Sequence, residues 1–203
     1  MAAFCPDLIG IDTSETPMKT FSGKAIKPDI TYYNSVRFNL ERADIESAEL
    51  MVEAKYSEQN DPFKDSPDDK DFLCDNDRAR RTLGQVTSYA TAHLAAQFRT
   101  HIFSILLFRK SARLMWWDRA GVIVSERIPL NESKLTQFFW RFSNATAEDR
   151  GHDSTVTSFI FTKDLTKEFL FDQLQFAADP GDVKVEDVNS LRYYCHGKTT
   201  AMS

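Results

Sequence analysis

Two carboxylates and a lysine in the first third of the chain have the residue types and spacing to hold a divalent metal ion. Asp29 begins a short run of strand-forming residues, 30–33, and Glu53-x-Lys55 lies in a mostly apolar run, 50–56. Side chains alternate between the faces of a strand, so we expect Glu53 and Lys55 on the same face. Carboxylates from adjacent strands can bind Mg²⁺ or Mn²⁺, which prefer hard oxygen ligands. Asp29 and Glu53 are therefore the predicted metal ligands.

The residues that would act beside this ion are Lys55 and side chains of a long helix predicted over residues 78–98. A bound divalent ion lowers the pKa of a water and polarises a phosphodiester oxygen. Lys55 could orient that water or stabilise the charge of a pentacovalent phosphate. Gln85 and Tyr89 lie one turn apart on one face of the helix. The predicted catalytic residues are Asp29, Glu53, Lys55, Gln85 and Tyr89, and the predicted phosphate contacts on the same helix face are Arg78 and Arg81.

A glutamate and a lysine in this spacing also have a simpler explanation, an exposed edge strand with a harmless cross-strand charge pattern. That explanation is sufficient for an isolated pair such as Glu53 and Lys55. Here an acid precedes the pair and a helix with Gln85 and Tyr89 follows it. Together these residues could supply metal ligands and phosphate contacts, so the combination favours chemistry.

The composition indicates one globular domain of the α/β or α+β class. The chain has 203 residues, of which 42% are hydrophobic, and its 16 Phe and 3 Trp against 7 Gly favour a packed body over a loop-rich scaffold. The net charge of -5 argues against nucleic-acid binding through bulk basicity. A polyanionic partner would need a local basic patch or a bound cation.

Cysteine usage and the N-terminal sequence favour a reducing compartment. Cys5, Cys74 and Cys195 are scattered and lack C-x-x-C spacing, which argues against a disulfide framework or a zinc site. The N-terminal residues lack the basic and apolar regions of a signal peptide, and no run is long enough to span a bilayer. We expect a soluble cytoplasmic or nuclear protein without membrane contact.

The order of the predicted elements describes a mixed sheet flanked by helices. Strands are predicted at 30–33, 50–56, 102–108, 113–117 and 122–125, and helices at 78–98 and 130–143. The first helix lies between two strands and is free to cross one face of the sheet. The expected division is an irregular arm at 1–27, a core at 28–145 and an extension at 146–203 packed on the core. In the extension, strands are predicted at 159–161 and 191–198 and a helix at 165–177.

The remaining candidate sites are interpreted as structural. The acid-rich segment 61–77 is predicted to be a solvated, mobile loop, because it lacks the glycine and glutamate spacing of a calcium loop. His93 is expected to be a partly buried, hydrogen-bonded residue, and His152 a structural residue of a charged turn. One of Trp116 and Trp117 is expected in the core and the other against an adjacent helix.

The acid, the E-x-K pair and the Gln-Tyr helix together resemble the signature of the PD-(D/E)xK, or restriction-endonuclease-like, superfamily, particularly its RecB-like branch. On this chain the signature falls on Asp29, Glu53, Lys55, Gln85 and Tyr89. The order strand, strand with E-x-K, helix, strand is similar to the core of that superfamily. The resemblance implies a restriction-endonuclease-like core with a Mg²⁺ or Mn²⁺ cofactor and a nucleic-acid partner, DNA more than RNA.

A second resemblance covers residues 28–155. The matching segments are 84–90 (GQVTSYA), 97–101 (QFRTH), 112–121 (ARLMWWDRAG), 138–142 (FFWRF) and 150–153 (RGHD). They are similar to the region that precedes the kinase lobe in fungal-type protein kinases, which implies descent from that two-part architecture. The chain has no glycine-rich phosphate loop, V-A-I-K lysine, H-R-D or D-F-G, so no kinase lobe and no kinase activity are expected.

One departure from the superfamily leaves two functions to distinguish. Nuclease-like relatives usually carry a helix ahead of the first strand, often with a further acidic residue, whereas residues 1–27 do not look helical and Asp12 and Glu15 are poor replacements. The first hypothesis is a metal-dependent nuclease-like domain that binds and hydrolyses phosphodiester bonds. The second is a catalytically inactive copy of the same fold, used in regulation or protein binding. The sequence does not decide between a monomer and a homodimer, nor whether the chain binds a protein partner.

Overall fold

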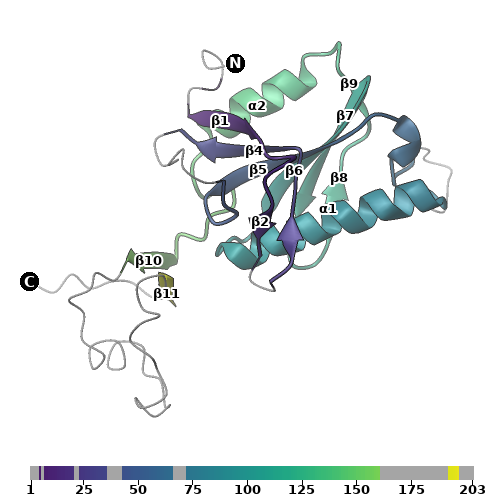
Figure 1. Cartoon of the computed structure of the whole chain (residues 1–203). Helices are drawn as coiled ribbons and strands as arrows, with labels where there is room; N and C mark the ends of the chain where they lie inside the picture. Colours follow the sequence, from purple (N-terminus) through teal and green to yellow (C-terminus); the bar gives the residue numbers. More distant parts are fainter. Residues whose placement is uncertain are drawn as a thin grey trace, which may run out of the picture. The chain divides into compact units, whose positions relative to one another are not determined.

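The computed structural model describes residues 5, 7–20, 23–35, 43–65, 72–160 and 192–196. Contacts divide the chain into two compact units, Met1–His152 and Asp153–Ser203. The first unit is a mixed seven-stranded sheet with two α-helices, an α+β fold (Figure 1). This agrees with the mixed sheet and flanking helices expected from the sequence.

The sheet has one parallel pair of strands, and the long helix lies between them in the sequence. In the described residues the strand order is β1-β4-β5-β6-β7-β8, with β9 also paired to β7. The strands are β1 (Leu8–Asp12), β4 (Ile30–Asn34), β5 (Ala48–Lys55), β6 (Ile102–Phe108), β7 (Ser111–Trp117), β8 (Val122–Val124) and β9 (Ile128–Pro129). Among the described strands only β5 and β6 pair in parallel, and α1 (Asp77–Ala96) lies in the crossover that joins them.

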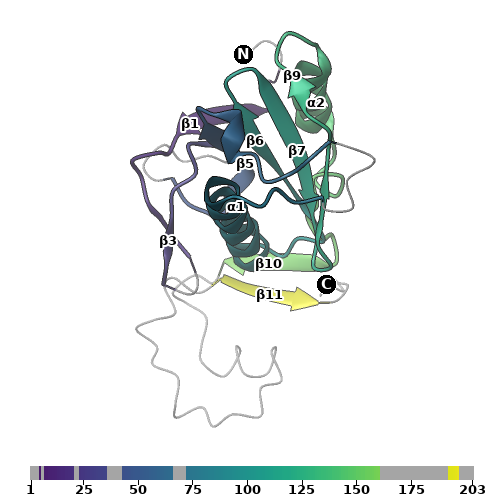
Figure 2. The ribbon, with the colours of Figure 1, turned by 90° about the vertical axis from the view of Figure 1, so that its right-hand side faces the viewer.

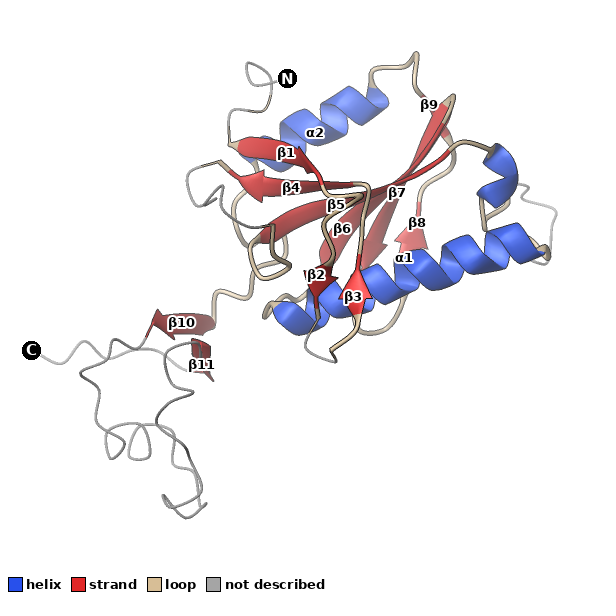
Figure 3. Cartoon of the chain, in the orientation of Figure 1, coloured by secondary structure: helices blue, strands red, loops and turns tan. Residues whose placement is uncertain are grey.

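The two helices cover opposite faces of the sheet, as the cartoon coloured by secondary structure shows (Figure 3). On one face Leu50 and Val52 pack in the core that contains the aromatic side chains of α2 (Lys134–Asn144). On the other face Met51 packs with Tyr89 and other residues of α1. The alternation predicted for β5 is thus confirmed, and it places Glu53 and Lys55 on the α1 side of the sheet.

The helix α1 begins at Asp77, directly after its capping residue Asn76. Asn76 has extended backbone angles, and its side-chain Oδ1 accepts a hydrogen bond from the backbone N–H of Ala79 at 2.9 Å. Val86 and Ala90 are buried against β6 and β7 in a second core (Figure 2 shows the helix in front of the sheet). The helix predicted over residues 78–98 ends two residues earlier, at Ala96, and Phe98 beyond its end is 45% exposed.

The N-terminal arm predicted to be irregular contains three strands. Besides β1, the short strands β2 (Met18–Lys19) and β3 (Ala25–Ile26) pair with each other. β1 is only five residues long, and its antiparallel partner β4 supplies its inter-strand hydrogen bonds. Leu8 is buried in the core on the α2 face. The prediction was wrong because a short strand is specified by its partner more than by its own residues.

The acid-rich segment after residue 60 is not fully solvated as predicted. Asp61 is 1% exposed and accepts hydrogen bonds from the Nε of Arg113 at 2.8 and 2.9 Å and from the Nε of Arg127 at 2.6 Å. Arg113 is itself buried in β7 and also donates to the carbonyl oxygen of Phe63 at 3.0 Å. A buried guanidinium requires a paired charge, so this ion cluster holds the segment against the sheet.

The turn at residues 146–152 belongs to the first unit, beyond the core boundary predicted at residue 145. Thr100 N–H donates to the carbonyl of Gly151 at 2.9 Å, and the backbones of Arg99 and His152 form an isolated antiparallel β-bridge. Gly151 has a φ of +96°, and a Cβ at this position would lie 1.9 Å from the carbonyl oxygen of His101. Only glycine fits this turn.

The second unit contains one antiparallel pair, β10 (Val156–Ile160) and β11 (Arg192–His196). These strands overlap the predicted strands at 159–161 and 191–198. The predicted helix at 165–177 lies outside the described residues. In the part of the chain that is described, no helix is long and apolar enough to cross a membrane.

Replacing Asp61 by alanine should destabilise the first unit by about 3–5 kcal/mol, because the buried Arg113 would keep only the partly exposed Asp65 as a counter-charge. The matched control is Asp75→Ala, since Asp75 pairs with Arg80 at an exposed position and its loss should cost less than about 1 kcal/mol. Urea unfolding followed by circular dichroism measures both. Equal losses for the two variants would contradict a structural role for the buried pair.

Candidate functional site

The predicted acidic residues meet where β4 begins and β5 ends. The strands are antiparallel, and their register pairs Ile30 with Val52, which brings Asp29 beside Glu53. Oδ2 of Asp29 accepts a hydrogen bond from the backbone N–H of Ala54 at 2.7 Å. The two carboxylates predicted to hold a metal ion are therefore neighbours at the end of β5.

Glu53 has one paired and one unpaired carboxylate oxygen. Its side chain is 4% exposed, and Oε1 accepts a short hydrogen bond from the Nζ of Lys55. Oε2 is buried and has no hydrogen-bond partner. A buried carboxylate oxygen without a donor is unfavourable in the folded chain, so this atom is a candidate ligand for a cation.

A chain of hydrogen bonds links Lys55 to the helix α1 and to the start of β4. Lys55 Nζ donates to Gln85 Oε1 at 2.9 Å, and Gln85 Nε2 donates to the hydroxyl oxygen of Tyr89 at 2.8 Å. Tyr89 in turn donates to the carbonyl oxygen of Lys27 at 2.8 Å. The structure thus brings all five predicted catalytic residues together and fixes the position of the lysine ammonium.

The environment shifts the pKa of the two groups nearest the core. Burial raises the pKa of Glu53, and the charge of Asp29 acts in the same direction, although Lys55 and the side chain of Gln85 oppose both. Burial also raises the pKa of Tyr89, so its hydroxyl stays protonated as a donor. Glu53 is therefore a carboxyl group whose ionised form needs further positive charge.

A polar depression of about 400 Å³ lies beside Lys55, between α1 and the short helix η1 (Glu58–Asn60). Its lining residues are Lys55, Asn60, Arg78, Arg81, Thr82 and Gln85. Arg78 Nη1 donates to Gln59 Oε1 at 2.8 Å, whereas Arg81 is exposed. Three cations and no carboxylate line the depression, so its chemistry suits an anion.

The site offers two carboxylates to a metal ion. Glu53 Oε2 is unpaired, and Asp29 uses Oδ2 for the Ala54 hydrogen bond. Within the described ranges, no group of three or more His, Cys, Asp or Glu residues is arranged as a metal site. The donors present fit an ion such as Mg²⁺, which binds through one or two carboxylates and keeps several waters.

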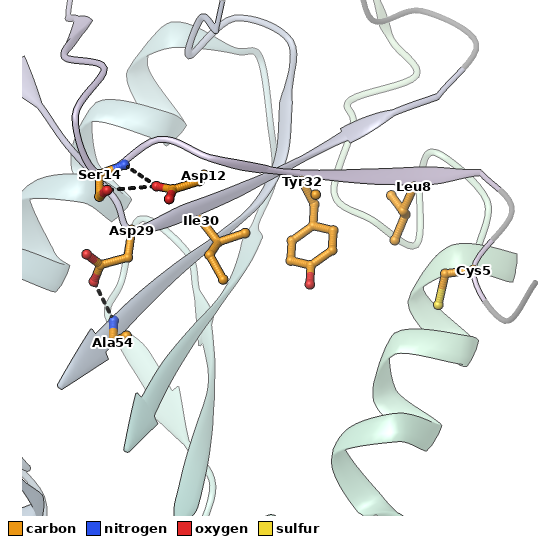
Figure 4. A pocket seen from close by; sticks show the side chains of 9 residues that line it. Cys5, Leu8, Asp12, Ser14, Asp29, Ile30, Tyr32 and Ala54 are labelled. Atoms are coloured by element: carbon orange, nitrogen blue, oxygen red, sulfur yellow. Dashed lines mark hydrogen bonds between the residues drawn. The ribbon is translucent and has the colours of Figure 1, made fainter. Parts of the chain in front are cut away.

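A second pocket, of about 480 Å³, opens on the opposite side of the end of β5. Asp29 and Ala54 line it together with Asp12 and Ser14, as Figure 4 shows. Sequence reasoning set Asp12 aside, and it also missed Asn60 and Thr82 in the basic depression. The acid at the end of the apolar run 8–12 was the available signal for Asp12, once that run is recognised as a strand.

His152 and Trp117 have the structural roles predicted for them, whereas His93 is fully rather than partly buried and the Trp116 ring lies 5.4 Å from the ring of His101, where a helix contact was predicted. His93 is 1% exposed and its Nε2 is 2.9 Å from the carbonyl oxygen of Ala48, and burial lowers its pKa to about 3. His152 Nε2 lies 3.1 Å from Glu49 Oε2. Trp117 is buried and its Nε1 donates to Ser104 Oγ at 2.8 Å.

No family model matches this chain, and no curated protein matches it. Among solved structures, the chain is similar to a chain of a DrdV–DNA complex determined by electron cryomicroscopy. The two share 14% sequence identity and a TM-score of 0.34, and the match covers 70% of this chain and 10% of the other. A likeness this weak carries no argument about function. Membership of the two families that the sequence resembles therefore stays a prediction.

The two buried glutamates should respond to pH in opposite directions. Glu53 keeps its proton to higher pH in the folded chain than in the unfolded one, so its ionisation reduces stability as the pH rises above 4.5. Without divalent ions, Glu53→Gln should therefore gain stability relative to the wild type as the pH rises above that value. Urea unfolding at a series of pH values measures the difference.

Glu49 provides the matched comparison. Burial alone would raise its pKa, but the His152 hydrogen bond and the charges of Arg99, His152 and Arg150 lower it to about 2. Its ionised form stabilises the fold fully above pH 4.5, and this contribution is lost as the pH falls toward 2. The deficit of Glu49→Gln should shrink over that window. Parallel pH profiles for the two variants would contradict the assignment.

Proposed function

We propose that the first unit is a restriction-endonuclease-like domain that hydrolyses phosphodiester bonds of nucleic acid with a bound Mg²⁺ or Mn²⁺ ion. The observation that carries the proposal is the unpaired, buried Oε2 of Glu53 beside a second carboxylate, Asp29. A buried carboxylate oxygen without a hydrogen-bond donor is costly unless a cation binds it. The adjoining basic depression supplies a place for the substrate phosphate.

The residues have separate roles in this mechanism. Asp29 and Glu53 would hold the ion, which when bound lowers the pKa of a water and polarises the phosphoryl oxygen. Lys55 Nζ lies against Glu53 and orients the attacking water toward phosphorus, then stabilises the negative charge of the pentacovalent state. Water adds to phosphorus and releases a proton to solvent, the P–O bond to one nucleoside breaks, and the leaving oxygen takes a proton from solvent.

Gln85 and Tyr89 act as positioning residues. The hydrogen bonds from Lys55 to Gln85 and on to Tyr89 and the Lys27 carbonyl hold the ammonium in one orientation. A preorganised charge stabilises a transition state without reorganisation at the moment of reaction. Arg78 and Arg81 would contact the flanking backbone phosphates from the depression.

A catalytically inactive fold of the same kind is the second candidate. Asp29 already accepts a hydrogen bond from Ala54, and Lys55 already donates to Glu53 and Gln85. Many of the polar groups of the site are therefore hydrogen-bonded to one another without a ligand. The described residues ahead of β4 form strands and no helix, so they lack the leading helix of nuclease-like relatives. This second candidate retains the fold as a regulatory or protein-binding module.

The nuclease proposal predicts metal-dependent cleavage that requires Glu53 and Lys55. Labelled DNA and RNA should be cut with Mg²⁺ or Mn²⁺ and not with EDTA, and Glu53→Gln and Lys55→Ala should each reduce the rate by about 100-fold or more. The controls are Glu132→Gln and Lys110→Ala, which change exposed side chains outside the site. A wild type that cuts neither substrate, and takes up no Mn²⁺ in titration calorimetry, would favour the inactive module.

Phosphate contact by Arg81 predicts a change in the salt dependence of binding. Arg81→Ala should weaken binding of DNA and reduce the slope of log K against log salt concentration by about 1, because one fewer counterion is released. Fluorescence anisotropy in EDTA at several salt concentrations measures the slope without cleavage. Arg119→Ala, in the exposed turn between β7 and β8, is the matched control. An identical effect of both substitutions would remove Arg81 from the interface.

A further inference from the structure

The second pocket has an apolar interior and a polar mouth. Its volume is about 480 Å³, within the range of small-molecule sites. Leu8, Ile30 and Tyr32 line the interior, and Asp12 and Asp29 stand at one end. Figure 4 shows the two carboxylates at that end, with Ile30 and Tyr32 along the pocket and Leu8 and Cys5 at the far end.

Glycine at position 10 allows the Tyr32 ring to form part of this pocket. A Cβ on Gly10 would lie 2.8 Å from Cε1 of Tyr32, so any other residue would displace the ring. The ring also packs on Phe139 of α2, with their centroids 5.1 Å apart. The pocket therefore presents a fixed aromatic side chain beside an aliphatic one, which suits a flat apolar ring.

Asp12 has one carboxylate oxygen committed to its own turn and one available to a ligand. Oδ1 accepts hydrogen bonds from the backbone N–H of Ser14 at 3.0 Å and from the Ser14 hydroxyl at 2.7 Å. No described residue donates a hydrogen bond to Oδ2. These bonds to Ser14 lower the pKa of Asp12, so the group is an anion that selects a hydrogen-bond donor and repels a phosphate.

The pocket adjoins the proposed catalytic site through consecutive residues of β5. Ala54 lines this pocket and Lys55 lines the basic depression, because successive side chains of a strand point to opposite faces. Asp29 lines the pocket and bonds to Ala54. A phosphate held at the end of β5 would therefore have the depression on one side and the apolar pocket on the other.

We propose that this pocket holds the base of the nucleotide next to the reacting phosphate, and that Asp12 Oδ2 accepts a hydrogen bond from the exocyclic amino group of that base. The inference rests on the proposed function for the location of the phosphate. A base inside a stacked duplex cannot enter a pocket, so the substrate is single-stranded at this nucleotide. Cytosine presents the required donor, whereas thymine presents a carbonyl oxygen at the same position.

Binding of single-stranded oligo(dC) and oligo(dT) of equal length, measured by fluorescence anisotropy in EDTA, tests the pocket apart from catalysis. The wild type should bind oligo(dC) about tenfold more tightly than oligo(dT), and should bind a duplex of mixed sequence more weakly than either strand alone. In Asp12→Asn the Oδ1 bonds to Ser14 can persist while an amide donor replaces Oδ2. This variant should lose the preference for oligo(dC) or reverse it toward oligo(dT).

Asp118→Asn is the matched control, because Asp118 Oδ1 accepts the backbone N–H groups of Ala120 and Gly121 in a similar turn away from the pocket. Its preference should equal that of the wild type. Equal binding of the two homopolymers, an unchanged preference in Asp12→Asn, or tighter binding of the duplex would overturn the inference.

Cleavage assays separate this inference from the nuclease proposal. If the wild type cleaves without base or strand preference, the pocket assignment fails and the nuclease proposal stands. If nothing is cleaved while oligo(dC) binding still depends on Asp12, the nuclease proposal fails and the base pocket stands.

Discussion

The register of β5 is the constraint on which the rest of the first unit depends, and charged side chains hold the strand at both ends. At its start the buried guanidinium of Arg99 donates to the carbonyl of Ala48 at 3.0 Å and to Glu49 at 3.1 Å. At its end Asp29 accepts the N–H of Ala54. A slip of one residue would move every side chain of β5 to the other face and would leave these charges unpaired in the core. These charged contacts therefore fix the register of β5 in the sheet.

This fixed strand end separates two different chemical environments. On the α1 side, Lys55 adjoins a depression lined by cations, and on the other side Ala54 adjoins an apolar pocket with an acidic mouth. Glu53, on the α1 side beside Lys55, is buried with one unpaired oxygen. Leaving such a group in a folded core is unfavourable, and natural folds concentrate unfavourable polar groups at functional sites. The unfavourable burial and the proposed chemistry thus both fall on three consecutive residues at the end of β5, Glu53 to Lys55.

Local patterns in the sequence were sufficient for the strands from β4 to β8, for both α-helices and for most of the candidate site. Alternation placed Glu53 and Lys55 on one face, and the helical repeat placed Gln85 and Tyr89 on one row facing them. Asp61 was misjudged, because an acid-rich segment has the same composition whether it is solvated or paired. The available signal was Arg113, a guanidinium in the middle of an apolar strand, which must find a buried partner.

The amino-acid pattern alone specified the faces of β5 and α1 and the order of the core elements, because each of these depends on residues close together in the chain. Tertiary structure alone decided that residues 8–12 form a strand and that Asp12 lies near Asp29. It also decided which acid neutralises Arg113. Such pairings join segments far apart in sequence, and their free energy depends on the packing of the whole unit, which no local propensity contains.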